Sequence, residues 1–349
     1  MIRECIPLLL ENQELTPDQA RATMREIMSG DATPSQVAAF LIGLKKKRES
    51  AEEITALAQA MRDFAKRISP RINGYLLDTC GTGGDRTKTF NVSTTAAFVI
   101  AAAGVPVAKH GNRSFTSKCG SADVLEQLGL NLNMSPEMVT RAIEEIGIGF
   151  MFAPNFHPAM KNVAAIRKEI GVRTVFNILG PLTNPAGANA QIIGVYDSEL
   201  LEPMCLAANN LGAKSVMTVY GLDGVDEIST TGKTALVRCQ NGHVSREEVE
   251  PEDLGLKRGM IEQVAGSDPE ANARLTAKIL SGSLRADDPR VQIVLANAAA
   301  GLVLCERAKS FREGVEIASK VVSDRIPFQT LRLLVQFSGG DPQRLNSMV

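Results

Sequence analysis

Apolar positions recur at helical spacing through the first 70 residues, and polar capping signals divide this stretch into separate helices. Three start signals occur, at Thr16-Pro17, at Thr33-Pro34 and at Ser50 with Glu53. Gly30 marks the end of the first of these helices. The pattern predicts a small helical domain over residues 1–70. Because its apolar faces have no strand to cover, they pack either against a second copy of the chain or within the chain itself.

The hydrophobic period changes after Tyr75, where short apolar runs begin to alternate with helix-length segments. The expected strands are YLLDTC, VPVAKHG, IGFMFA, AQIIGVY, KSVMTVYG and KTALVRC. Such alternation predicts an α/β domain over residues 71–349, with a mainly parallel central sheet covered by helices on both faces. Helices near 158–182 are expected to pack on the helical domain, with hinges near 70–80 and 180–187.

Composition narrows the class of protein. The chain of 349 residues has a net charge of −1, 4% aromatic residues and no Trp, which argues against nucleic acid or an anionic membrane as a partner. The N-terminal stretch carries acids and lacks a long apolar run, so neither a signal peptide nor a membrane span is expected. Six cysteines without a C-x-x-C pair indicate reduced thiols and a cytoplasmic protein.

The first candidate for chemistry is the segment GTGGD, Gly81 to Asp85, directly after the first expected strand. Glycines let the backbone approach a phosphate, and the following segment NVST opens a helix whose N-terminus favours an anion. The alternative is a tight turn followed by an ordinary N-cap. Neither a Walker motif nor a dinucleotide fingerprint fits. Asp85 would repel a bare phosphate, so a sugar hydroxyl, an amide or a metal-bound group suits it better.

A second anion loop follows the next expected strand, in AKHGNRSFTSKCGSAD. This loop combines four cations with four hydroxyls, namely Lys109, His110, Arg113 and Lys118 with Ser114, Thr116, Ser117 and Ser121. A solvated basic loop is the alternative. Because parallel strands end at the same edge of a sheet, two such loops together favour a ligand with more than one phosphate.

Two further features suggest a metal ion and a carboxylate ligand. Asp226 and Glu227 are adjacent acids in a glycine-rich loop, and Mg²⁺ is usually held by one or two carboxylates together with ligand phosphates. Arg167 shares a helical face with Met160, Val163 and Ile170, so its charge needs an anionic partner. That partner is either a small carboxylate substrate or an acid of the chain.

Taken together, these motifs resemble those of the anthranilate phosphoribosyltransferase family in order and spacing over nearly the whole chain. The matching segments are DTCGTGGD, FNVST, KHGNR, GSADVLEQLG, HPAMKNVAAIRKEIGVRTVFNILGPLTNP and DEIST. The resemblance implies a nucleoside-phosphorylase-like fold, a homodimer formed through the helical domain and a Mg²⁺-dependent reaction with two ions per subunit. In that reaction, anthranilate and 5-phosphoribosyl 1-pyrophosphate give N-(5-phosphoribosyl)anthranilate and pyrophosphate, a step of tryptophan biosynthesis.

The resemblance also implies roles for individual residues. The site for 5-phosphoribosyl 1-pyrophosphate would comprise Gly81, Gly84, Asp85, Thr89, Asn91, Val92, Ser93, Thr94, Lys109, His110, Gly111, Asn112, Arg113, Ser114, Phe115, Thr116, Ser117 and Ser121. Anthranilate would contact Gly81, Asn112 and Arg167, and Mg²⁺ would be held by Ser93, Asp226 and Glu227. Cys119 stands where the family often has serine, and we leave it out of the site.

The chemistry of this reaction requires no strong base, because an aromatic amine is a neutral nucleophile at pH 7. We therefore assign no residue as an essential base. Two alternatives remain open at this point: a pyrimidine nucleoside phosphorylase of the same architecture, and a non-catalytic protein that binds phosphoribosyl compounds. The non-catalytic binding protein would need neither Arg167 nor the acid pair. The phosphorylase fits the GTGGD and NILGPLTNP segments less well than the transferase does.

Overall fold

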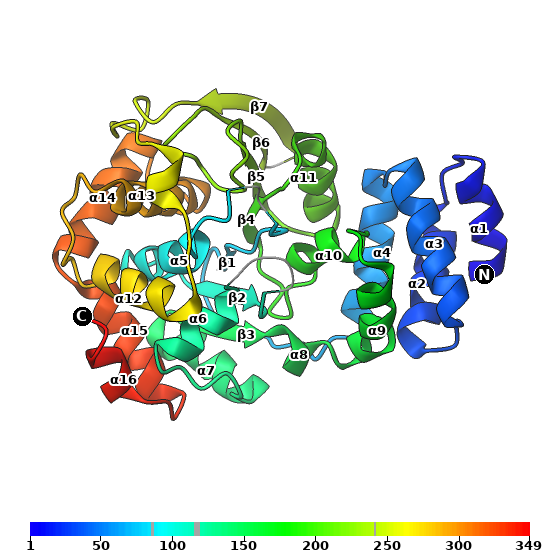
Figure 1. Cartoon of the computed structure of the whole chain (residues 1–349), viewed down its shortest axis with the longest axis horizontal. Helices are drawn as coiled ribbons and strands as arrows, with labels where there is room; N and C mark the ends of the chain where they lie inside the picture. The colour runs from blue at the N-terminus through cyan, green and yellow to red at the C-terminus, as the bar shows by residue number, and fades with distance from the viewer. Residues whose placement is uncertain (85–86, 115–118, 241) are drawn as a thin grey trace.

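A computed structural model describes residues 1–84, 87–114, 119–240 and 242–349 of the chain (Figure 1). Five residues singled out from the sequence, Asp85, Phe115, Thr116, Ser117 and Lys118, lie outside the described residues. Within the part that is described, none of the helices combines the length and the apolar character needed to span a membrane.

The chain begins with four helices that lie together at one end of the molecule (Figure 1). They are α1 (Ile2–Leu10), α2 (Pro17–Ser29), α3 (Pro34–Lys47) and α4 (Ala51–Asp63). The last three begin at the predicted signals, and Thr16, Thr33 and Ser50 each form a complete capping box. Gly30 ends α2 with φ 86°, a left-handed conformation that glycine adopts without strain. The helix starts predicted from the sequence are therefore confirmed.

A buried ion pair holds the start of α4. The carboxylate of Glu53 is fully buried and lies 2.7 Å from Lys47 Nζ, whose side chain is 5% exposed. The same carboxylate accepts hydrogen bonds from the backbone N–H groups of Leu15 and Ser50, both at 2.9 Å. Glu53 thus connects α4 to the loop between α1 and α2 and to the end of α3.

We expect Glu53→Gln to lower the free energy of unfolding by about 3–5 kcal/mol, because it leaves the Lys47 ammonium buried without a counter-charge. Urea unfolding followed by circular dichroism would measure this loss. Glu52→Gln is the matched control, since Glu52 precedes it on α4 and is exposed, and its effect should stay within about 0.5 kcal/mol. Equal losses for the two variants would contradict the role given to the buried pair.

The larger part of the chain is built on one seven-stranded sheet in the order β3-β2-β1-β4-β5-β6-β7. The strands are β1 (Leu77–Asp78), β2 (Val107–Gly111), β3 (Ile148–Phe152), β4 (Ala190–Gly194), β5 (Ser215–Gly221), β6 (Thr234–Gln240) and β7 (His243–Val249). Strands β1 to β5 are parallel, whereas β6 and β7 add an antiparallel hairpin at one edge. The predicted α/β class with a mainly parallel sheet is confirmed.

Helices cover both faces of this sheet (Figure 1). Between the strands lie α5 (Val92–Ala102), α6 (Ser121–Gln127), α7 (Pro136–Ile146), α8 (Ala153–Phe156), α9 (Lys161–Ile170), α10 (Phe176–Leu182) and α11 (Leu201–Asn210). After β7 come α12 (Pro269–Leu280), α13 (Pro289–Leu304), α14 (Phe311–Ser323), α15 (Ile326–Phe337) and α16 (Pro342–Asn346). Short 3₁₀ turns occupy Pro158–Met160, Ser198–Leu200 and Ile261–Val264.

Alternation along the strands divides the apolar side chains into two cores. Ile192 and Met217 point into the core formed with α5, α7 and α12 to α15, whereas their neighbours Ile193 and Val216 point into the other. The second core continues through α11, α10 and α9 into the helices α1 to α4. Helix α9 contacts α2 and α3, and α10 contacts α4. The N-terminal helices are thereby joined to one face of the sheet.

Strand β7 was not predicted, and the reason is its composition. Its residues HVSREEV are exposed up to Glu248, and only Val249 is buried. An edge strand with both faces in solvent has no apolar alternation to reveal it. The charges along it also discourage pairing with another chain.

Candidate active site

A cavity of about 670 Å³ opens at the carboxyl ends of the parallel strands. The strand order changes direction between β1 and β4, which is where ligands bind in open α/β sheets. The cavity is bounded by the end of β4 and the segments after β1, β2, β3 and β5, and also by α9, α10 and Met61 of α4. Most predicted residues line it, namely Gly81, Gly84, Thr89, Asn91, Val92, Ser93, Thr94, Lys109, His110, Gly111, Asn112, Arg113, Ser121, Arg167, Asp226 and Glu227.

The glycine-rich loop after β1 is held against the end of β4. The Thr82 backbone N–H donates to the Gly194 carbonyl at 2.8 Å, and its hydroxyl donates to the same oxygen at 3.2 Å. The absence of a side chain at Gly194 also lets the Asp226 backbone approach closely, because a Cβ there would collide with the Asp226 carbonyl oxygen. The glycine-rich loop after β1 and the loop of the acid pair therefore meet at one glycine.

Helix α5 begins at the cavity wall with Val92, so its N-terminus, which favours negative charge, lies at the cavity. Asn91 is the N-cap residue of this helix, but its side chain makes no capping hydrogen bond. Its amide instead donates to the Cys119 carbonyl at 3.3 Å and accepts from Asn272 Nδ2 at 3.1 Å. Asn91 thus links the start of α5 to the second anion loop and to α12.

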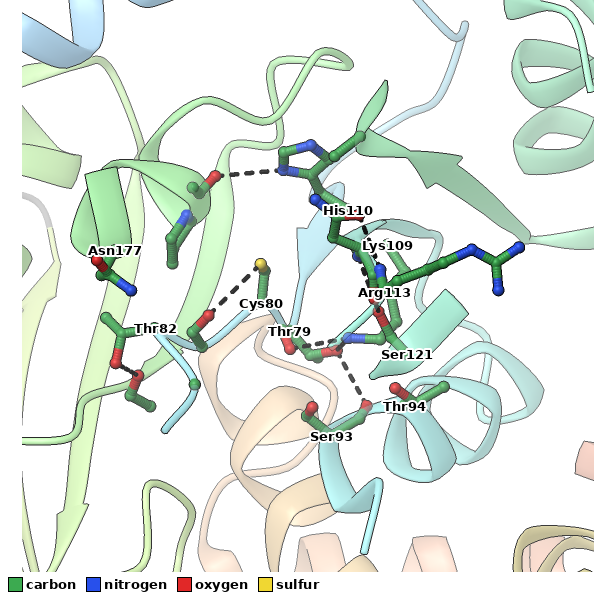
Figure 2. A pocket seen from close by; sticks show the side chains of 18 of the residues that line it. Thr79, Cys80, Thr82, Ser93, Thr94, Lys109, His110, Arg113, Ser121 and Asn177 are labelled. Carbon is green, nitrogen blue, oxygen red and sulfur yellow. Dashed lines mark hydrogen bonds between the residues drawn. The ribbon is translucent and has the colours of Figure 1, made fainter. Parts of the chain in front are cut away.

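The cations of the second loop are partly engaged within the chain (Figure 2). Lys109 Nζ is buried and donates to the Thr79 carbonyl at 3.0 Å and to its hydroxyl at 3.2 Å. Arg113 pairs with Asp123 at 3.0 Å and with Glu126 at 2.7 Å, and these carboxylates raise its pKa. Both residues still line the cavity, but part of their charge supports the loop rather than facing open space.

Ser114 differs from its neighbours, because it is not among the residues that line the cavity. Its backbone N–H donates to Asp123 Oδ2 at 3.0 Å, and the N–H of Gly120 donates to the same oxygen at 2.9 Å. Asp123 therefore connects Ser114 and Gly120, which lie on either side of the part of the second loop that the structure does not describe. Ser121 closes it further, since its hydroxyl accepts from Asn112 N at 3.2 Å.

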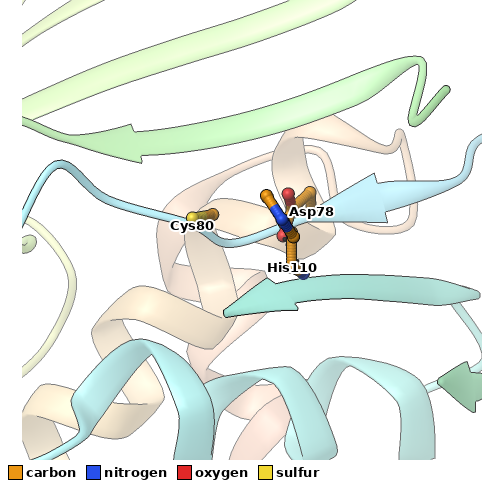
Figure 3. Close-up of side chains that lie close together, drawn as sticks. All are labelled: Asp78, Cys80 and His110. Carbon is orange, nitrogen blue, oxygen red and sulfur yellow. Dashed lines mark hydrogen bonds between the residues drawn. The ribbon is translucent and has the colours of Figure 1, made fainter. Parts of the chain in front are cut away.

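A group of three possible metal ligands lies where β1 meets β2 (Figure 3). Asp78, Cys80 and His110 place ligand atoms within 4.8 Å of one another. However, Asp78 Oδ1 already accepts from the His110 backbone N–H at 3.2 Å, and Oδ2 accepts from Asn184 Nδ2 at 2.7 Å. Burial raises the pKa of Asp78 to about 6, and the charge of Lys109 opposes that rise. We interpret this group as the structural support of Lys109 rather than as a Mg²⁺ site.

His110 and His157 face each other in the cavity wall, with ring centroids 5.1 Å apart. Nδ1 of His110 lies 3.2 Å from the Gly180 carbonyl, and its Nε2 is buried with no hydrogen-bond partner among the described residues. Burial lowers the pKa of His110 to about 3 and that of His157 to about 4. Both rings are consequently neutral at physiological pH.

These lowered pKa values predict a loss of stability in acid. Below pH 6.5 the unfolded chain binds a proton at His157, whereas the folded chain does not until the pH approaches 4, so stability falls as the pH falls across this window. We expect His157→Gln to reduce the slope of the free energy of unfolding against pH by up to about 1.4 kcal/mol per pH unit in this window. Urea unfolding at several pH values would measure it. Parallel pH profiles for the two proteins would contradict a buried neutral His157.

The acid pair of the β5–β6 loop offers the donor set that Mg²⁺ prefers. Asp226 and Glu227 both line the cavity, and Glu227 is only 9% exposed. Glu227 Oε1 accepts the backbone N–H of Ser93 at 3.0 Å, which places the carboxylate beside the Ser93 hydroxyl at the start of α5. Carboxylate and hydroxyl oxygens are hard ligands, so these residues fit a magnesium ion that also binds ligand phosphates.

Arg167 lies on the opposite wall of the cavity, on α9. Its guanidinium stands 5.4 Å from the ring centre of Phe176, a position that allows a cation–π contact. Burial lowers the pKa of Arg167. The predicted stripe is present, since Val163 is fully buried while Met160 and Ile170 are half-buried. An arginine and an aromatic ring beside each other suit a small aromatic carboxylate.

Several residues at the site were not found from the sequence. Thr79, His157, Asn177 and Asn297 all line the cavity, but each comes from a different segment. Only the fold brings them together. His157 alone had a signal, being one of three histidines in the chain.

Comparison with known proteins shows which class of protein this chain belongs to. Residues 73–324 match the glycosyl transferase family, a/b domain, and residues 3–65 match the glycosyl transferase family, helical bundle domain. The chain is thus a glycosyl transferase with a helical bundle followed by an α/β domain.

Individual relatives narrow the class further. Anthranilate phosphoribosyltransferase of Methanocorpusculum labreanum is 48% identical over 97% of this chain and 99% of its own length. The anthranilate phosphoribosyltransferase of Symbiobacterium thermophilum is 50% identical over 94% of this chain and 95% of its own length. The crystal structure of the Thermus thermophilus enzyme superposes with a TM-score of 0.89 at 42% identity, covering 96% of this chain and 99% of that one.

The Saccharomyces cerevisiae enzyme in complex with PRPP and Mg is more distant. It gives a TM-score of 0.88 at 28% identity, over 97% of this chain and 98% of that one. The chain belongs to the anthranilate phosphoribosyltransferase family.

Proposed function

We propose that this protein transfers the 5-phosphoribosyl group from 5-phosphoribosyl 1-pyrophosphate to the amine of anthranilate, in tryptophan biosynthesis. The observation that carries this proposal is the two-sided cavity. Its sheet side holds the glycine loop, the start of α5 and the acid pair, and its helical side holds Arg167 beside Phe176. The relatives support this transferase rather than a nucleoside phosphorylase or a non-catalytic binding protein.

In this reaction the bond between ribose C1 and the pyrophosphate oxygen breaks, and a bond from C1 to the anthranilate nitrogen forms. Pyrophosphate leaves with the bonding electron pair, and the new secondary amine loses one proton. The pKa of about 3 makes His110 a weak base, so we assign the proton to no side chain. Charge develops on the ribose and on the leaving group, and stabilising that charge is the main task of the site.

For 5-phosphoribosyl 1-pyrophosphate we propose contacts from the glycine loop, the start of α5 and the second loop, at the predicted residues that line the cavity. For the metal we propose Ser93, Asp226 and Glu227, with two ions per subunit. When bound, Mg²⁺ would neutralise the pyrophosphate as it leaves. The positive end of the α5 helix would stabilise the phosphate charge, and the buried Glu227 would keep its orientation through its bond to Ser93 N.

For anthranilate we propose Gly81, Asn112 and Arg167. Arg167 would bind the carboxylate and thereby direct the amine toward C1, which is a proximity effect. Residues 1–70 and 71–349 would form two units, with hinges near 70–80 and 180–187. The helices near 158–182 would pack on the first unit, and Arg62 of α4 supports this packing because it donates to the Leu182 carbonyl at 2.7 Å.

We further propose a homodimer that forms through the helical domain, in the cytoplasm. Leu10 and Ile42 support the dimer, since they leave 58% and 43% of their surfaces exposed on α1 and α3. All six cysteines are free thiols, in keeping with a reducing compartment. Light scattering should give twice the chain mass at micromolar concentration, and a monomer mass would refute the dimer. Cell fractionation tests the compartment.

The function is tested by the fluorescence of anthranilate in a mixture of protein, Mg²⁺ and 5-phosphoribosyl 1-pyrophosphate. We expect the fluorescence to fall with time and to stay constant when either Mg²⁺ or the sugar is omitted. A nucleoside phosphorylase would leave anthranilate unchanged but consume uridine and phosphate. A binding protein would consume neither.

A further inference from the structure

Asn297 holds the loop that carries the acid pair through two hydrogen bonds to one residue. It lies on α13, is 4% exposed, and contacts Ile228, which directly follows Glu227. Its Oδ1 accepts from Ile228 N at 2.9 Å, and its Nδ2 donates to Ile228 O at 3.0 Å. A third bond, from Nδ2 to the Ile293 carbonyl at 2.8 Å, fixes the amide on its own helix.

This pairing restrains the backbone on both sides of Ile228. The Ile228 N–H belongs to the peptide bond that begins at the Glu227 carbonyl, so the bond to Oδ1 sets the plane of that peptide. The Ile228 carbonyl belongs to the next peptide, and Nδ2 fixes that plane as well. Two fixed peptide planes determine the backbone dihedrals of Ile228. The backbone that follows Glu227 is thereby fixed, and the Glu227 carboxylate accepts the Ser93 backbone N–H at 3.0 Å.

Helix α13 is otherwise apolar around this position. It is buried on nearly all sides, with apolar neighbours at Val294, Ala296 and Ala298. A buried carboxamide is costly unless its donors and acceptor are satisfied, and an apolar residue would avoid that cost. The polar side chain is placed where its bonds act on the loop of the acid pair. Asn297 itself lines the cavity but offers its amide to Ile228 rather than to open space.

We propose that Asn297 is a positioning residue for the metal: it orients Glu227 so that this carboxylate and Asp226 bind one cation together. The proposal rests on the proposed function, in which the acid pair holds Mg²⁺. Residues that hydrogen-bond to metal ligands and orient them typically contribute about 10- to 100-fold to metal affinity.

The test is Mn²⁺ binding, followed by the electron paramagnetic resonance signal of the free ion. Protein and 5-phosphoribosyl 1-pyrophosphate are present, anthranilate is absent, and the same titration without protein sets the contribution of the sugar phosphate. We expect Asn297→Leu to weaken Mn²⁺ binding about 10- to 100-fold. Gln292→Leu is the control, because Gln292 is also buried on α13 but bonds Lys257 N at 3.2 Å, away from the acid pair. It should change Mn²⁺ affinity less than about twofold while lowering the melting temperature.

If the leucine variant fails to fold, Asn297→Ser is used in its place. Serine is smaller and cannot pair with both backbone groups of Ile228, so this variant should also bind Mn²⁺ more weakly. Wild-type Mn²⁺ affinity in a folded Asn297 variant would overturn the proposal and leave Asn297 a purely structural residue. The double variant Asp226→Asn, Glu227→Gln separates this failure from failure of the proposed function. If it too binds Mn²⁺ like wild type, the metal role of the acid pair is wrong. If only the Asn297 variants do so, the positioning role alone is wrong.

Discussion

The double substitution Asp226→Asn with Glu227→Gln is expected to lower kcat by at least about 100-fold, while the fold remains intact. Both acids line the cavity beside Ser93, and the change keeps their size but removes two negative charges. Without them, Mg²⁺ would lose two of its three proposed protein ligands, and the charge that develops on pyrophosphate as the C1–O bond breaks would be poorly neutralised. Steady-state rates at several Mg²⁺ concentrations measure the effect, and a melting curve checks the fold.

An adjacent acid pair elsewhere provides the control. Glu247 and Glu248 lie exposed on the edge strand β7, and replacing both by Gln removes the same charge far from the cavity. That variant should keep the wild-type rate. Near-normal turnover of the Asp226, Glu227 variant at low Mg²⁺ would show that these acids do not hold the metal.

Arg167→Ala should raise the apparent KM for anthranilate about 10- to 150-fold, with a much smaller effect on that for 5-phosphoribosyl 1-pyrophosphate. The estimate comes from the loss of a charge-assisted hydrogen bond, worth about 1.5–3 kcal/mol. Arg167 lies on the wall of the cavity that α9 and α10 form, beside Phe176, so its loss should affect one substrate selectively. Initial rates with each substrate varied in turn give both constants.

Lys168→Ala is the matched control, because Lys168 is the next residue on α9, carries the same charge and is exposed. Its kinetic constants should equal those of wild type. If Arg167 serves only an internal ion pair, Arg167→Ala should instead lower the melting temperature and disturb both substrates alike. A stable Arg167→Ala protein with unchanged anthranilate KM and kcat would remove Arg167 from the site.

The sequence predicted features that depend on local chemistry. Capping boxes at Thr16, Thr33 and Ser50 involve only residues three positions apart, so their pattern is visible in the chain itself. The cavity-lining positions of the glycine loop and of the acid pair followed from a general rule, because parallel strands end at a shared edge. Strand β7 escaped detection because both of its faces are polar.

The direction of each side chain could not be predicted, since it depends on partners distant in sequence. Lys109 looks like a phosphate ligand in the sequence, yet its ammonium donates to Thr79, 30 residues earlier. Arg113 is engaged by acids of α6. Asn297 lies 69 residues from the Ile228 backbone that it holds, and no local pattern marks it among the apolar residues of α13. Such contacts become visible only when the fold is known.

One measurement addresses the central proposal most directly: identification of the products from anthranilate, 5-phosphoribosyl 1-pyrophosphate and Mg²⁺. Mass spectrometry should find N-(5-phosphoribosyl)anthranilate, and a coupled assay should find one pyrophosphate released for each anthranilate consumed. The same mixture with the Asp226→Asn, Glu227→Gln protein should yield little of either. Unchanged anthranilate with the wild-type protein, or release of pyrophosphate without the anthranilate adduct, would contradict the proposed transfer.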